Sequence, residues 1–412
     1  MLDSATDEAI ASGKLYSDLD RKYELFGQLR REDPVHWTEP EGYRPFWTVT
    51  RHADIMEIER QNDRFLNEPR SRLVSIEFES RVASLMQGRP LLTQSMHSMD
   101  GERHRAFREI TSNWFMPLQL KTLEEGIAKL AKDAVDDLQA RGPECDFYKD
   151  IAVWFPLRVI MLILGLPEQD AAHLQMLTSA YFGGGDPEQQ KAGDVIDAAQ
   201  AFRAYFGEIA KARRAHPTDD VASLIANARI DGELVDEYLV SSYYIALASA
   251  GHDTTSASAA GGVLALIENP RQWALLRENP ALVKSAADEF IRWVSPINHF
   301  FRTAKDDCEF RGRQIKAGQN LMMVYPSGNR DDEAFDDPNA FKVDRRANRH
   351  LGFGFGVHMC LGAILAKMEI QTLLREILAR VSRFELNGTP TWVQTTFVGG
   401  LKTLPVRVVM RG

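Results

Sequence analysis

A loop of glycines around a single cysteine, residues 352–362, most constrains what this chain can fold into. Glycines at alternating positions allow positive φ angles and let the backbone approach a flat ligand closely. Cys360 is followed by a helix-forming run, 361–369, so we expect its sulfur at a helix N-terminus, where the dipole and free N–H groups stabilise a thiolate. The sequence therefore predicts a tight loop that presents Cys360 to a metal or as a nucleophile.

Four roles for Cys360 were compared. Zinc normally needs four Cys or His ligands in paired spacings, and only His358 lies nearby. A nucleophile could use His358 as its base, but the loop offers no oxyanion stabilisation beyond the helix dipole. A buried structural cysteine leaves the glycines unexplained. An axial thiolate to haem iron needs one cysteine, close backbone approach and apolar faces, and it fits the pattern best.

The loop resembles the haem-binding signature F-x-x-G-x-x-x-C-x-G of the cytochromes P450, whose fixed positions are filled by Phe353, Gly356, Cys360 and Gly362. The resemblance extends over nearly the whole chain. It implies a mainly α fold with small β-sheets, a triangular prism of helices with haem b between a long distal helix and the cysteine loop. Residues 1–412 are then expected to form one domain.

A buried brace is the first structural feature that the resemblance implies. Glu289 and Arg292 match the E-x-x-R helix of the family, and Arg345 falls where a second arginine joins that ion-pair network. The first two lie one helical turn apart and can interact. By itself such a pair is usually solvated on a helix surface.

The resemblance also implies the residues around the haem. Cationic or hydrogen-bonding partners are expected for its propionates, which are anions. They are His104, Arg108, Arg302 and His358. Phe353 and Gly354 of the loop are expected to lie against the haem. Gly101-Glu102 stands where the family usually has prolines, and an ordinary basic helix surface would explain His104 and Arg108 as well.

Residues 250–255 place glycine, an acid and two threonines in the middle of an apolar helix, a costly arrangement that suggests function. The stretch resembles the distal helix of the family. Ala250 and Gly251 would then leave room for dioxygen beside the iron. Thr254 would hydrogen-bond the iron-bound oxygen, and Asp253 would help relay protons so that the distal oxygen leaves as water. A kinked helix with a locally satisfied Asp253 is the alternative explanation.

The substrate pocket is inferred from the resemblance alone. Its expected residues are mostly apolar and predict a compact hydrophobic substrate; they are Phe78, Leu91, Leu92, Tyr181, Phe182, Leu247, Ile297, Asn298, Phe300 and Phe397. Within the family, the stretches 295–300, 349–354 and 397–402 are most similar to the bacterial terpineol hydroxylase type. A monoterpenoid or alkyl-aromatic substrate is therefore expected.

Composition limits the partners. The net charge of −9 argues against nucleic acid, and three distant cysteines make a disulfide framework improbable and point to a reducing compartment. The first residues resemble no signal peptide, and the apolar runs 151–167 and 238–267 carry polar residues, so cytoplasmic localisation without a membrane span is expected. No four-cysteine cluster exists, so electrons must come from elsewhere. The resemblance implies a separate ferredoxin with its NAD(P)H-dependent reductase.

A basic proximal patch is the expected ferredoxin site; its residues are Arg103, Arg105, Arg345, Arg346 and Lys367. Scattered solubilising charge explains these residues about as well. The predicted activity is monooxygenation with O2. A haem-thiolate peroxygenase or isomerase is one alternative, and a non-catalytic haem-containing binder is another. The pair Asp253 and Thr254 counts against the peroxygenase or isomerase, and a non-catalytic binder leaves the threonines of the distal helix unexplained.

Overall fold

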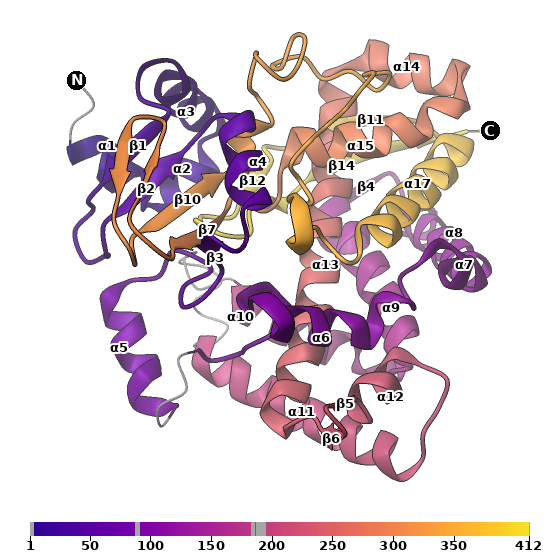
Figure 1. Ribbon diagram of the computed structural model, residues 1–412. Coiled ribbons are helices and arrows are strands. Elements are labelled where there is room, and N and C mark those ends of the chain that lie inside the picture. Colours follow the sequence, from indigo (N-terminus) through magenta and orange to yellow (C-terminus); the bar gives the residue numbers. More distant parts are fainter. Residues whose placement is uncertain (1–3, 87–90, 183–185, 187–194, 412) are drawn as a thin grey trace.

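The computed structural model describes residues 4–86, 91–182, 186 and 195–411. Figure 1 shows the largest sheet on one side of the molecule and most of the long helices on the other. Helix α13, Glu237–Glu268, runs through the middle and packs against α9 (Trp154–Leu164), α11 (Val195–Ala215) and α15 (Val283–Val294). The expected mainly helical architecture with small sheets is confirmed.

The remaining helices surround these four. In chain order they are α1 Ser4–Ile10, α2 Gly13–Ser17, α3 Leu19–Glu32, α4 His52–Arg60, α5 Ile76–Leu85, α6 Gly101–Ser112, α7 Pro117–Leu120, α8 Glu124–Arg141, α10 Ala171–Phe182, α12 Val221–Ala226, α14 Pro270–Glu278, α16 Tyr325–Gly328 and α17 Ala363–Arg380. Short 3-10 turns include η1 Met96–Ser98 and η7 Gly356–His358, and the turn Tyr148–Ala152 before α9 is a π-helix.

The largest sheet has the strand order β1-β2-β10-β7-β3. Its strands are β1 Val35–Thr38, β2 Phe46–Val49, β10 Asn320–Val324, β7 His299–Ala304 and β3 Phe65–Leu66. A second sheet joins β11 Val381–Leu386, β14 Pro405–Met410 and β4 Glu144–Asp146. Three two-stranded ribbons pair β5 Arg229–Ile230 with β6 Glu233–Leu234, β8 Cys308–Phe310 with β9 Arg313–Ile315, and β12 Thr391–Trp392 with β13 Leu401–Thr403.

Two N-terminal regions differ from what their sequence patterns predict, and residues that cap helices explain the difference. The helical pattern over residues 5–31 predicts one helix, but Ser12 and Asp18 each cap a new one, so three short helices form. The sequence pattern of residues 65–99 predicts no regular structure. The segment nevertheless contains α5, whose first turn is capped by Ser75 Oγ. Strands β1 and β2 form an antiparallel hairpin in which Val35 pairs with Val49 and Thr38 with Phe46.

The long helix α13 is buried over most of its length, because residues on several of its faces pack into the core. Asp236 caps its start by accepting hydrogen bonds from the N–H groups of Tyr238 and Leu239. Its apolar composition comes from this burial inside the protein. Over the described residues, no helix combines the length and the apolar character needed to cross a membrane.

Candidate active site

The loop that carries Cys360 is pressed against α4. A Cβ atom added to Gly356, which has φ +73°, would lie 2.6 Å from the backbone oxygen of Glu59. Gly354 also has positive φ, at +67°. The N–H of Cys360 donates to the carbonyl oxygen of Phe353 at 2.9 Å and closes the turn. Only glycine fits these two positions without strain, as the sequence predicted.

Cys360 lines an interior cavity of about 250 Å³, here named the thiol cavity, together with residues of α13, α17 and the cysteine loop. Burial raises the pKa of the Cys360 thiol, and the Gly362 N–H and the Arg108 guanidinium lower it by less. The predicted stabilisation at a helix N-terminus is therefore outweighed by burial, and α17 begins three residues later, at Ala363. A metal cation at the sulfur would supply the charge that favours the thiolate.

The predicted brace is fully buried. The Arg292 guanidinium donates to both carboxylate oxygens of Glu289, at 2.7 and 2.8 Å, and Arg345 Nε donates at 3.0 Å. Asn348 Nδ2 and the N–H of Lys342 also donate to Glu289. A buried ion pair needs such additional hydrogen bonds to offset its desolvation. The network ties α15 to the segment that leads into the cysteine loop.

Unpartnered nitrogen atoms lie at one edge of the thiol cavity. Among the described residues, His104 Nε2 and Arg302 Nε are buried without a hydrogen-bond partner. His358 stacks on His104 at 3.9 Å, and its Nε2 accepts from Asn67 Nδ2 at 2.7 Å. Burial and nearby positive charges lower the pKa of His358 to about 2, so it is neutral. Unsatisfied buried donors are costly and indicate an anionic group that binds here.

Arg108 and Arg302 complete this edge. Arg108 donates to the carbonyl oxygen of Met359 at 2.7 Å. Arg302 donates to Glu59 Oε1 at 3.1 Å, and the Tyr325 hydroxyl donates to the same oxygen at 2.7 Å. Burial raises the pKa of Glu59, although Arg302 and Tyr325 counteract this. Glu59 was missed in the sequence because it lies 243 positions from its arginine partner and belongs to no motif.

The middle of α13 faces the thiol cavity with Ala250, Gly251 and Thr254. A Cβ atom on Gly251 would lie 2.5 Å from Ile160 Cδ1, so this glycine permits close packing of α13 on α9. Thr254 Oγ1 donates to the carbonyl oxygen of Ala250 at 2.7 Å. Its oxygen keeps accepting capacity beside the cavity.

Asp253 is the next residue of α13, and its side chain lies away from both cavities. Its Oδ1 is 3.3 Å from His252 Nδ1, and burial raises the pKa of Asp253. His252 Nε2 donates to the carbonyl oxygen of Val153 at 2.9 Å. Asp253 is thus within ion-pair distance of His252, but His252 Nδ1 makes no hydrogen bond among the described residues. Burial nevertheless favours the protonated form of the carboxyl group.

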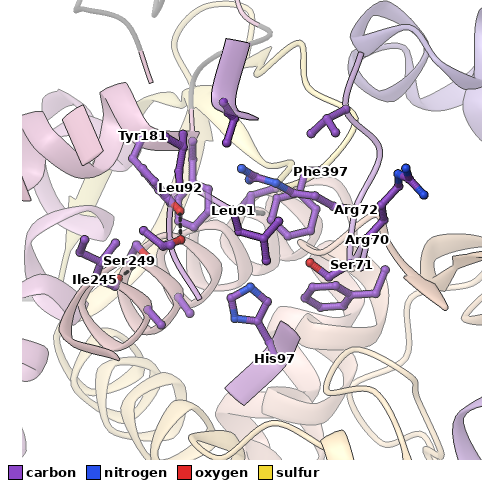
Figure 2. Close-up of a pocket in the computed structure, with 18 of the residues that line it drawn as sticks. Arg70, Ser71, Arg72, Leu91, Leu92, His97, Tyr181, Ile245, Ser249 and Phe397 are labelled. Carbon is purple, nitrogen blue, oxygen red and sulfur yellow. Dashed lines mark hydrogen bonds between the residues drawn. The ribbon is translucent and has the colours of Figure 1, made fainter. Parts of the chain in front are cut away.

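A second cavity of about 370 Å³, here named the outer cavity, adjoins the first. Both cavities share lining residues, among them Ala250, Thr254, Ile297 and Phe300. Eight of the predicted pocket residues line the outer cavity, and they are Phe78, Leu91, Leu92, Tyr181, Phe182, Ile297, Phe300 and Phe397. Figure 2 shows Leu91, Phe397 and Tyr181 among the side chains that line it.

Two pocket expectations differ from the structure. Leu247 lines the thiol cavity. Asn298 lines neither cavity, because its Nδ2 donates to the carbonyl oxygen of Thr395 at 3.4 Å and its N–H donates to that of Phe397. Asn298 therefore supports the loop that presents Phe397. Several polar residues of the outer cavity, among them Arg72 and His97, belong to no recognisable motif and were not predicted.

Three comparisons with known proteins agree. The family model for cytochrome P450 matches residues 194–405. Cytochrome P450-terp of Pseudomonas sp is 41% identical over 404 residues, covering 95% of this chain and 94% of that protein. Linalool 8-monooxygenase of Pseudomonas putida is 33% identical, with 94% and 95% covered.

The chain belongs to the cytochrome P450 family. The crystal structure of CYP108D1 from Novosphingobium aromaticivorans superposes on this P450 with a TM-score of 0.93 at 40% identity, and each chain is covered completely. The predicted fold and the resemblance to the bacterial terpineol hydroxylase type are confirmed, and the protein is a P450 monooxygenase.

Haem is the cofactor of this family, and the residues of the thiol cavity fit it. The cavity places one thiol opposite Ala250 of α13, and its edge holds the unpartnered nitrogens of His104 and Arg302. The ten residues predicted to bind the cofactor all line this cavity; they are His104, Arg108, Ala250, Gly251, Arg302, Phe353, Gly354, His358, Cys360 and Gly362.

Proposed function

We propose that this P450 hydroxylates a compact hydrophobic substrate, a monoterpenoid or alkyl-aromatic molecule, with O2 and electrons from a ferredoxin. The single observation that carries this proposal is the largely apolar outer cavity of about 370 Å³, which adjoins the cavity of Cys360. A pocket of this kind binds a small hydrocarbon body by burial. The names of two relatives, P450-terp and linalool 8-monooxygenase, support a terpenoid.

In this proposal the thiol cavity binds haem b, with Cys360 as the iron ligand. His104, Arg108, Arg302 and His358 bind the propionates: Arg108 and Arg302 supply positive charge, His104 Nε2 and Arg302 Nε have no hydrogen-bond partner among the described residues, and His358 is a neutral hydrogen-bonding group beside them. Haem supplies the reductive activation of dioxygen when it is bound.

Proton supply is assigned to α13. Hydroxylation converts R–H, O2, two electrons and two protons into R–OH and water, so two protons must reach the cavity. Desolvation raises the pKa of the Asp253 carboxyl, which favours its protonated form and suits a group that passes on protons. Thr254 Oγ1 lies beside both cavities and can accept and pass on a hydrogen bond. These two residues are the proposed catalytic pair.

Ferredoxin docking is proposed on the surface around the cysteine loop. Val357, Met359 and Ile364 are exposed there, with 46%, 46% and 41% of their surface accessible. Of the predicted basic residues, Arg105 and Arg346 are exposed. Arg345 was predicted to belong to this basic patch, and that prediction is wrong, because Arg345 is buried in the brace and cannot contact a partner.

The other two basic residues of the predicted patch are already engaged. Arg103 contacts Glu68 at 3.6 Å, and Lys367 contacts Asp288 at 2.6 Å. We propose further that residues 1–412 form one P450 domain and that it works in the cytoplasm, where NADH supplies the ferredoxin reductase.

A ligand screen followed by product analysis tests the function. Terpenoids and alkylbenzenes are titrated into the holoenzyme while the shift of the Soret band is recorded, and bound compounds are incubated with ferredoxin, reductase and NADH. Hydroxylated product in proportion to NADH consumed is expected. Turnover with hydrogen peroxide alone that exceeds the NADH-driven rate would favour a peroxygenase. No NADH consumption with any bound ligand would favour a non-catalytic binder.

A further inference from the structure

Arg72 is a cation without an acidic partner on the wall of the outer cavity. It lies between β3 and α5 and is half-buried. Its guanidinium carbon is 5.2 Å from the ring centroid of Phe397. Among the described residues, its side chain makes no ion pair and no hydrogen bond. Figure 2 shows Arg72 beside Phe397, whereas Arg70 points away from the other lining residues.

The other charges of the outer cavity compensate one another. Arg70 Nε lies 2.6 Å from Glu79, and Arg44 Nε lies 2.8 Å from the other oxygen of the same carboxylate. The ionised side chains among the described lining residues are Arg70, Arg72 and Glu79. They leave one positive charge, which Arg72 carries, next to an otherwise largely apolar space.

The histidines near Arg72 add no charge at neutral pH. Burial, and to a lesser extent the charge of Arg72, lowers the pKa of His97 to about 4. Burial also lowers the pKa of His299 to about 3, again with a small contribution from Arg72. His97 Nδ1 is held at 2.6 Å by Ser95 Oγ, and its ring lines both cavities. A neutral polar side chain thus lies between the Arg72 side and the thiol side.

Resting on the proposed function, we infer that the substrate is a monoterpenoid or alkyl-aromatic carboxylate, and that Arg72 binds its carboxylate. The planar guanidinium offers paired N–H donors that match a carboxylate, and the attraction is strengthened where water is partly excluded. Arg72 lines only the outer cavity, whereas Ala250 and Thr254 also line the thiol cavity. The hydrocarbon therefore extends past His97, and oxidation takes place at the end remote from the carboxylate.

Three ligands with the same isopropyl-substituted benzene ring distinguish the effect of a ligand's charge on binding from the effect of its shape. They are 4-isopropylbenzoate, its methyl ester, and p-cymene, which carries a methyl group in place of the carboxylate. Each is titrated into the holoenzyme at pH 7.5, and the Kd is read from the Soret shift. We expect the acid to bind wild type most tightly. Arg72→Gln should raise the Kd of the acid by about 10- to 100-fold and change the Kd of p-cymene by no more than about 2-fold.

Control variants keep the test specific. Arg72→Lys should restore part of the affinity for the acid, because it retains the charge without the fork. Arg70→Gln should leave the ratio of the acid and p-cymene Kd values unchanged, since Arg70 is paired with Glu79. The unchanged Kd of p-cymene also reports that the pocket of each variant is folded.

Two results overturn the inference while the proposed function stands: p-cymene or the ester binds wild type as tightly as the acid, or Arg72→Gln weakens all three ligands equally. Failure of every ligand to shift the Soret band would overturn both proposals. A response to the acid alone supports this inference and narrows the proposed substrate class to carboxylates.

Discussion

The segment behind Cys360 and the wall of the outer cavity are stabilised by different kinds of interaction. Behind Cys360, a single buried carboxylate, Glu289, accepts hydrogen bonds from two buried arginines, a half-buried asparagine and a backbone N–H. At the outer cavity, the contacts are mainly between aromatic rings. The ring centroid of Phe397, for example, lies 5.4 Å from that of Phe300 and 6.2 Å from that of Phe182. Directional bonds fix one geometry, whereas apolar packing tolerates several shapes. The comparison indicates a rigid cofactor side and an adaptable substrate side.

The largest effect is expected when the thiol at the centre of the cofactor side is removed. Cys360→Ser should abolish the red-shifted Soret band of the reduced carbonyl complex and reduce monooxygenase turnover to background, because a hydroxyl is a much poorer ligand than a thiolate. Cys308→Ser, in β8, should leave the spectrum unchanged. A Cys360→Ser protein that keeps the red-shifted band would contradict the assignment.

Breaking the brace should lower the free energy of unfolding more than breaking any contact of the cavity wall. Arg292→Leu leaves the Glu289 carboxylate buried with fewer partners and should lower the free energy of unfolding by about 3–5 kcal/mol. Urea denaturation monitored by circular dichroism measures this. Lys129→Gln, which removes the exposed pair with Asp133, should leave the free energy of unfolding unchanged within the error of the measurement. Similar losses in both variants would remove the distinction.

The catalytic pair lies where the two regions meet. Asp253→Asn should lower the rate of product formation by about 100-fold and leave the Kd of the substrate unchanged, because the residue supplies protons and lines neither cavity. Thr254→Ala should consume NADH with little product, and Thr254→Ser should restore coupling. The ratio of product to NADH is the measurement. Full coupling in Thr254→Ala would remove this threonine from the mechanism.

His299 is buried behind the cavity wall, where its ring centroid lies 5.7 Å from that of Phe397, and it makes two directional hydrogen bonds. Its Nε2 accepts from the N–H of Leu73 at 2.9 Å, and its Nδ1 donates to the carbonyl oxygen of Thr396 at 2.8 Å. Its pKa is about 3 in the folded protein and 6.5 as the ordinary value, so the unfolded chain binds more protons between these limits. This contribution to stability is therefore complete above pH 6.5 and is lost as the pH falls toward 3.

Urea unfolding at pH 7.5 and 5.5 tests this contribution of His299. His299 should account for a loss of about 1 kcal/mol between these pH values, and His299→Gln should lack that part of the loss. Both values lie above the range in which ordinary carboxylates titrate. An equal pH dependence in wild type and variant would show that His299 is not held neutral.

The smallest expected effect concerns the exposed charges on the proposed ferredoxin surface. Neutralising Arg105 and Arg346 together should raise the KM for ferredoxin several-fold and decrease its salt dependence, because fewer screened charge pairs remain, with no change in substrate Kd. Arg229→Gln, on the distant ribbon of β5, is the matched control. Unchanged KM in the double variant would place the ferredoxin elsewhere.

The sequence by itself determined the features that depend on short spacing. The glycines around Cys360 require positive φ at Gly354 and Gly356, and the one-turn separation of Glu289 from Arg292 allows their ion pair. Helical periodicity located α13 and most other helices. These properties are local, so neighbouring residues specify them.

Only the tertiary structure decided which distant side chains meet. It placed Glu59 on Arg302, buried Arg345 in the brace, turned Asn298 away from the pocket and left Arg72 unpaired beside Phe397. It also reversed the expected effect on the Cys360 thiol, because burial outweighs the local donors. Burial and long-range pairing depend on how the helices and the sheet pack together, and no short sequence pattern encodes that packing.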